Sequence, residues 1–171
     1  MLRAFISLLT IGLLLAGCET FKPIPQGYIG PVAQIRDTVT PLGRSGADFF
    51  YVSKFDGKTI DNSMTRSRSA SYGQGFRMTS VAASRDIPAS PVTITIMGRR
   101  DYAAPIQALL SKIYEVSGEV ALNPEAGESY VVKGQLGESY SAVWLENEKT
   151  GALIGEKFEV KGSAAVGIME K

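Results

Sequence analysis

Val92-Thr93-Ile94-Thr95-Ile96-Met97 decides the fold class of this chain, because branched apolar residues alternate in it with threonine. Successive side chains of a strand point to opposite faces of a sheet, so a period of two rich in β-branched residues predicts a strand. The stretch therefore predicts a mainly β protein.

The same alternation recurs on both sides of this stretch, with turn-forming residues between the runs. Asp56 and Gly57 predict a tight turn after one run, and residues 123–127 (Asn-Pro-Glu-Ala-Gly) predict a turn after another. Several strands at intervals of about ten residues predict a single antiparallel β-sandwich, of the immunoglobulin-like or transthyretin-like kind, or a small barrel. The predicted strands are residues 49–55, 92–97, 114–122, 129–136, 140–146 and 152–160, with an edge strand at 28–37 in which Pro31 is tolerated.

One segment departs from the period of two. Ile106, Leu109, Leu110 and Ile113 lie at helical spacing, and Pro105 suits a first helical turn. This spacing predicts one short helix over residues 104–112 that caps an end of the sandwich. An apolar crossover loop is the alternative.

The start of the chain has the pattern of a secretory signal. A cationic Arg3 is followed by an apolar run from residue 4 to 15, which as a helix covers roughly 18 Å, against a bilayer core of about 30 Å. The run ends in Leu15-Ala16-Gly17-Cys18. This segment resembles the lipobox of bacterial lipoproteins, in which a signal peptidase cuts before an invariant cysteine.

The resemblance implies cleavage between Gly17 and Cys18 and a covalent diacylglycerol, with a further N-acyl chain, on Cys18. Cys18 is the single cysteine of the chain, so an intramolecular disulfide is impossible. The alternative is an ordinary secretory signal with an incidental cysteine. In Gram-negative lipoproteins the next residue influences sorting, and Glu19 favours the periplasmic face of the outer membrane if the source is Gram-negative.

These signals divide the chain into four parts. We expect a signal peptide at 1–17, a lipidated tether at 18–27, a β-sandwich domain at 28–161 and a strand or tail at 162–171. Prolines and glycines without a sustained period indicate a semi-extended tether, which could hold the domain up to roughly 40 Å from the lipid.

Composition excludes several classes of function. Without Arg3 the mature chain carries 17 basic and 17 acidic side chains, and this balance argues against a nucleic-acid binder. The chain has no histidine, the commonest general base and metal ligand. We therefore expect no metal, no cofactor apart from the attached lipid, and no serine-based catalysis.

The richest polar stretch, residues 61–85, carries the candidate binding site Arg66, Arg68, Tyr72 and Arg77. Aromatic and guanidinium groups together could bind a glycan or a phosphate-bearing polymer. The alternative is a solvated hairpin and loop. The sequence Gly73-Gln74-Gly75 within this stretch is interpreted as a bulge or bend in a strand.

Carboxylate pairs leave a hydrolase open as a further alternative, since glycosidase chemistry needs only two acids. The candidate pairs are Glu115 with Glu119, Glu125 with Glu128, and Glu146 with Glu148. A solvated turn explains the last pair better.

The domain also loosely resembles small β-sandwich lipoproteins of proteobacteria that have no assigned activity. The resemblance rests on residues 30–37, 51–58, 85–89, 103–106 and 127–144, within the span 28–160. It implies no catalytic residue. The sequence as a whole predicts a non-enzymatic, lipid-anchored envelope protein that binds or supports another periplasmic or outer-membrane protein, with a glycan, lipopolysaccharide or peptidoglycan binder as the alternative.

Overall fold

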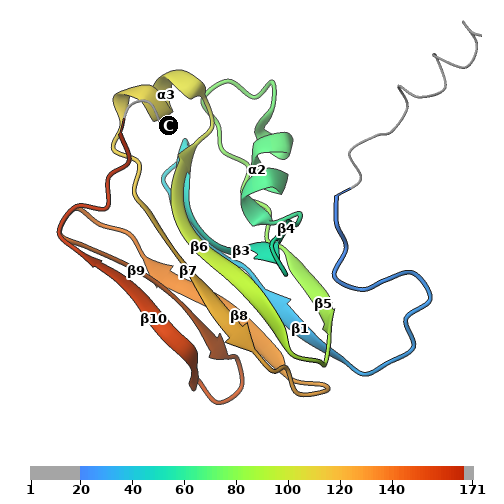
Figure 1. Cartoon of the computed structure of the whole chain (residues 1–171). Coiled ribbons are helices and arrows are strands. Elements are labelled where there is room, and N and C mark those ends of the chain that lie inside the picture. The colour runs from blue at the N-terminus through green and yellow to red at the C-terminus, as the bar shows by residue number, and fades with distance from the viewer. Residues whose placement is uncertain (1–19, 168–171) are drawn as a thin grey trace, which may run out of the picture.

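The protein is mainly β, with two packed sheets and two short helices within residues 20–167, the part of the chain that the computed structural model describes (Figure 1). The predicted fold class is thereby confirmed. The predicted signal peptide 1–17, its cleavage site at Gly17 and the lipidation site Cys18 lie outside the described residues. The elements are β1 (Val32–Arg36), β2 (Thr38–Leu42), β3 (Gly46–Phe55), β4 (Lys58–Thr59), α2 (Ser63–Ser71), β5 (Ser84–Pro88), β6 (Val92–Tyr102), α3 (Pro105–Leu110), β7 (Glu115–Leu122), β8 (Ser129–Gln135), β9 (Tyr140–Asn147) and β10 (Leu153–Lys161).

The strands form two five-stranded sheets. One has the order β10-β9-β8-β1-β5, and the other has the order β2-β3-β6-β7 with β4 paired to β3. Neighbouring strands are antiparallel except β1 and β8, which run parallel. The prediction of an edge strand at 28–37 was wrong, because β1 lies between β8 and β5. Pro31 precedes β1, so its missing N–H removes no bond from the ladder.

Side chains from the inner faces of both sheets form the main core. Ile35, Val132 and Leu145 of one sheet are fully buried, as are Ile94 and Ile96 of the other. The alternation read in residues 92–97 places these two isoleucines inward, as predicted. Burying each such side chain contributes about 1.5–3 kcal/mol.

Strand β3 is buried on both faces. Phe50 and Val52 point into the main core, whereas Phe49 and Tyr51 form a second cluster on the opposite face with Ala47. Helix α2 lies over that second face (Figure 1). The unbroken apolar run of β3 is therefore explained by a helix on one side and a sheet on the other.

Helix α2 was not predicted, and its sequence explains why. Its buried residues are the serines Ser63, Ser67 and Ser71, spaced by four, so hydropathy shows no helical period. Their small side chains let the helix approach the sheet. Ser67 Oγ accepts from the backbone N–H of Val81 at 2.8 Å and Ser71 Oγ accepts from that of Thr79 at 2.8 Å.

The start of α2 carries the signal that could have revealed the helix. The Asn62 side chain accepts from the N–H groups of Met64 and Thr65, and Thr65 Oγ1 accepts from the N–H of Asn62. This reciprocal arrangement is a capping box. The interpretation of Gly73-Gln74-Gly75 as a bulge in a strand was wrong, because these residues form turns directly after α2, with φ of 77° at Gly73 and 64° at Gly75.

The predicted helix over residues 104–112 is confirmed as α3, with Pro105 in its first turn. None of its residues is buried. Within the described residues no helix is both long and apolar enough to span a bilayer. In the C-terminal segment, Ala165 forms an isolated bridge with Tyr114, and the last four residues lie outside the described part.

Candidate functional site

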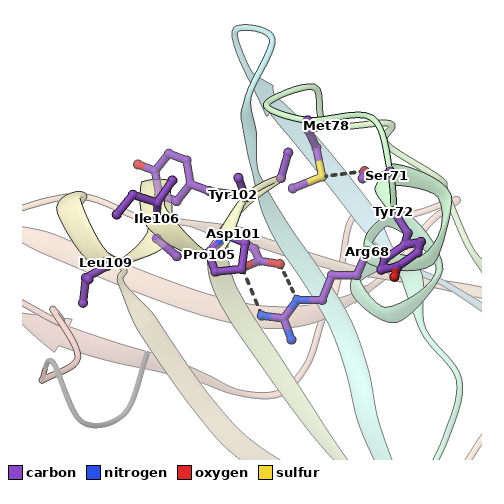
Figure 2. A pocket seen from close by; sticks show the side chains of 14 residues that line it. Arg68, Ser71, Tyr72, Met78, Asp101, Tyr102, Pro105, Ile106 and Leu109 are labelled. Atoms are coloured by element: carbon purple, nitrogen blue, oxygen red, sulfur yellow. Dashed lines mark hydrogen bonds and ion pairs between the residues drawn. The ribbon is translucent and has the colours of Figure 1, made fainter.

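A groove of about 950 Å³ lies between the C-terminal end of α2 and α3 (Figure 2). Arg68, Tyr72 and the glycine turn after α2 line one side. Tyr102, at the end of β6, and α3 line the other side. The groove is therefore built by segments about thirty residues apart in sequence, which β3 and β6 bring to the same end of the molecule.

An ion pair joins the two sides. The Arg68 guanidinium donates to both carboxylate oxygens of Asp101, at 2.5 and 3.0 Å (Figure 2). The Asp101 side chain is 4% exposed, whereas that of Arg68 is 52% exposed. The hydrogen bond to Asp101 holds the pKa of Arg68 above its ordinary value. Because the carboxylate neutralises this cation, the groove carries no unpaired positive charge at this point.

The rest of the groove is largely apolar. Ile106 and Leu109 of α3 are among its lining residues and are each 50% exposed, and Tyr72 of the facing side is 91% exposed (Figure 2). Leu110 (79%) and Phe76 (62%), which follow the lining residues Leu109 and Gly75 in sequence, are exposed as well. Helix α3 thus lies at the end of the sandwich as predicted, yet its apolar side chains are only partly covered.

The predicted site residues separate in the structure. Arg68 and Tyr72 both line the groove, whereas neither Arg66 nor Arg77 lines it. Arg66 forms an ion pair with Asp61 at 2.5 Å. Arg77 is exposed in the loop after α2, with no ion pair inside the described range. Only half of the predicted set therefore belongs to one site.

Three further arginines, one in residues 61–85 and two in β6, also form ion pairs with carboxylates. Arg85 is bound by Asp37, Arg99 by Glu115 and Arg100 by Asp48. The segment after residue 98 does approach α2, since Asp101 follows Arg100 and contacts Arg68. Carboxylates neutralise nearly all of these arginines. The contact between α2 and the segment after residue 98 therefore forms an apolar groove and not a basic one.

Sequence reasoning missed the contribution of Tyr102, Ile106 and Leu109 to this site. The apolar spacing of residues 106–113 was interpreted as a short helix that caps an end of the sandwich. Only Ile113, which follows the helix, is fully buried. No sequence signal distinguished a groove wall from a core-facing helix, because Ile106, Leu109 and Leu110 have the same spacing in both cases.

Four of the six candidate carboxylates, Glu115, Glu128, Glu146 and Glu148, contact basic or amide partners. Glu115 is bound to Arg99, Glu146 to Lys133 and Glu148 to Arg36. Glu128 accepts from the Asn147 side-chain amide at 2.7 Å. None of these acids lines the groove. In the described part of the chain there is no group of three carboxylate or cysteine side chains placed to hold a metal ion.

No family model matches this chain, and no curated protein or solved structure shows significant similarity to it. The geometry of the groove and the residues at the start of the chain are therefore the basis for assigning a function.

Proposed function

We propose that this protein is a non-enzymatic lipoprotein of the bacterial envelope that binds another envelope protein through the groove between α2 and α3. Two independent features support the proposal. The Leu15-Ala16-Gly17-Cys18 sequence supports lipid attachment at Cys18 and anchoring at the periplasmic face of the outer membrane. The half-exposed apolar side chains around the groove support a protein partner.

The groove carries the binding part of the proposal. Soluble monomers seldom expose a continuous apolar surface beside a concave site, and such surfaces mark interaction sites. Two or three apolar side chains of a partner segment would displace water from Ile106, Leu109 and Tyr72. The ion pair of Arg68 with Asp101 offers polar atoms at the floor that can orient that segment.

The lining residues of the groove do not match a serine hydrolase or a two-carboxylate hydrolase. Ser71 lines it, but the Ser71 hydroxyl donates to the Ser67 carbonyl at 2.7 Å and accepts from the Thr79 N–H, so its bonds serve the fold. Asp101 is the one carboxylate among the lining residues, and Arg68 is bound to it. A two-acid hydrolase would need a second carboxylate 5–10 Å away.

The alternative of a glycan or lipopolysaccharide binder rests on the arginines of residues 61–85. Anion recognition needs cations that are free to bind, and Arg66 and Arg68 are each paired with a carboxylate. These pairs favour the protein partner over the anionic glycan.

Site-specific crosslinking in cells tests the binding proposal. A photo-crosslinking amino acid at Leu109 in the groove is compared with one at Leu153 on β10, which has the same 50% exposure. We expect one protein to be captured at position 109 and not at position 153, and Ile106→Asp to reduce that capture at least several-fold. Equal capture at both positions, or none at 109, would refute the groove as the binding site.

A second arm of the experiment tests the alternative. Sacculi and lipopolysaccharide are sedimented with the purified protein at low and high salt. Salt-sensitive co-sedimentation that is lost in Arg66→Ala or Arg77→Ala would support the glycan binder. Co-sedimentation that none of these changes affects would contradict it.

A further inference from the structure

The N-terminal segment is attached to the sandwich earlier than the sequence suggested. Phe21 forms an isolated β-bridge with Ile60, and its ring lies 6.3 Å from that of Phe55. The Lys58 ammonium group lies 4.6 Å from the centre of the Phe21 ring. Phe21 thereby packs against the main core, seven residues before the expected start of the domain at residue 28.

This attachment limits how far the domain can lie from the membrane. Two residues lie between Cys18 and Phe21, and the three steps of extended chain that join them span at most about 11 Å. The whole segment from residue 19 to 31, if free, would span roughly 40 Å. Given the proposed lipidation of Cys18, on which this inference rests, the side of the domain that carries Phe21 is held next to the bilayer.

That side also carries an uncharged, exposed loop. No charged residue occurs between Lys22 and Arg36. The segment from residue 20 to 31 forms a wide loop that projects beyond β5 before it enters β1, on the side of the molecule away from β10 (Figure 1, blue). Uncharged backbone and proline-rich chain cost less to place among lipid headgroups than the charged loops that surround most domains.

The loop holds its apolar tip outward. The Tyr28 N–H donates to the Pro25 carbonyl at 3.2 Å, and the Tyr28 hydroxyl donates to the Pro31 carbonyl at 3.0 Å. Gly27 has a φ of 78°, which a glycine adopts without strain. Ile29, directly after this closed turn, is 100% exposed, and nearby Val32 is 38% exposed. The bonds of Tyr28 therefore fix a turn from which Ile29 projects into solvent.

We propose that residues 23–31 form a membrane-contacting loop, with Ile29 inserted into the lipid interface beside the acylated Cys18. The occupant of this surface is the bilayer itself, because the short link from Cys18 to Phe21 brings lipid to this side before any soluble partner. Lys22 and Lys58 flank the loop and suit anionic headgroups. The domain is then oriented on the membrane by two contacts, the lipid and the loop.

The orientation leaves the groove free. Gly46, which pairs with Tyr102 at the groove, and Phe55, which packs on Phe21, are the two ends of β3. The nine steps between them correspond to about 30 Å along the strand. A partner can thus occupy the groove while residues 23–31 contact lipid.

Fluorescence quenching in vesicles tests the loop. Acylation consumes the single native cysteine, so an introduced Ile29→Cys can be labelled alone with an environment-sensitive dye. Leu110→Cys on α3, which is 79% exposed, serves as the control position. Vesicles of phosphatidylethanolamine and phosphatidylglycerol contain spin-labelled lipid as the quencher. We expect at least twofold stronger quenching at position 29 than at 110.

The possible results separate the two proposals, provided that mass spectrometry of the same sample reports on Cys18. Equal quenching at both positions in acylated protein would overturn the loop proposal and leave the anchor proposal standing. An unmodified Cys18 in protein from the native host would instead overturn the anchor. In acylated Phe21→Ala protein we expect quenching at position 29 to fall, because a longer stretch of free chain then joins Cys18 to the domain. An unchanged value would contradict the role of Phe21.

Discussion

Replacing Asp37 with alanine should strongly destabilise the domain, because four donors converge on this carboxylate. Arg85 donates to its two oxygens at 2.9 and 2.7 Å. The backbone N–H of Val52 in β3 donates at 3.3 Å, and that of Ser63, the first residue of α2, donates at 2.9 Å. Asp37 thus connects β3, β5 and the start of the helix that carries Arg68 to the groove.

The size of the effect follows from burial. The side chains of Asp37 and Arg85 are 0% and 11% exposed, so removing the carboxylate leaves a guanidinium group largely buried without its counter-charge. Breaking a buried pair in this way costs about 3–5 kcal/mol. The two N–H groups that lose their acceptor also destabilise the folded state, and part of their cost is already included in this range. We expect a loss of about 4 kcal/mol, a large part of the 5–15 kcal/mol typical of a domain.

Urea denaturation of the soluble domain measures this loss. With a slope of about 2 kcal/mol per molar urea, the midpoint of Asp37→Ala should fall by about 2 M. Asp86→Ala, on the exposed side of β5, is the matched control and should shift the midpoint little. The double variant Asp37→Ala with Arg85→Met should be more stable than Asp37→Ala alone, because it removes the stranded charge. A loss below about 1 kcal/mol in the single variant would refute the reasoning.

Three further predictions concern a cap, a glycine and a titrating group. Asn62→Ala removes the acceptor for two N–H groups of the first turn of α2 and should cost about 1 kcal/mol in the same urea assay; no change would contradict the capping box. Gly134→Ala places a methyl group 2.3 Å from the Phe50 ring and should cost about 1–3 kcal/mol, so a wild-type midpoint would contradict the close packing. The ion pair with Lys133 and a hydrogen bond from the Trp144 indole hold the pKa of Glu146 below its usual range. The stability that this carboxylate contributes is therefore fully present above the unfolded-state pKa of about 4.3, and it is lost as the pH falls through the lower pKa of the folded state. The single tryptophan should report that step by fluorescence, with a midpoint below pH 4.3 that disappears in Glu146→Gln; a midpoint at or above 4.3 would contradict the assignment.

The strands could be predicted because they obey one rule that the local sequence displays. In β6 the isoleucines at 94 and 96 are inward and fully buried, and the threonine at 93 is exposed. What the period of two does not contain is the order of strands within a sheet. The parallel pairing of β1 with β8 joins residues nearly one hundred positions apart, and no local pattern encodes it.

The groove was harder to predict than the strands, for two physical reasons. Helix α2 buries serines, so its packing face has the composition of a loop. The charges of the predicted site are neutralised by partners far away in sequence, as in Arg68 with Asp101, and this pairing changes a predicted basic patch into an apolar groove. Tyr72 could be singled out from sequence, but the facing wall in α3 could not, because its apolar residues have the same spacing that a core helix would show.

Mass spectrometry of the N-terminal peptide, from protein purified out of its native host, tests the central proposal most directly. Lipid attachment predicts a mature chain that begins at Cys18 and carries a thioether-linked diacylglycerol and an acylated α-amino group. A peptide with a free Cys18 thiol, or with residues of the leader still attached, would contradict lipid anchoring.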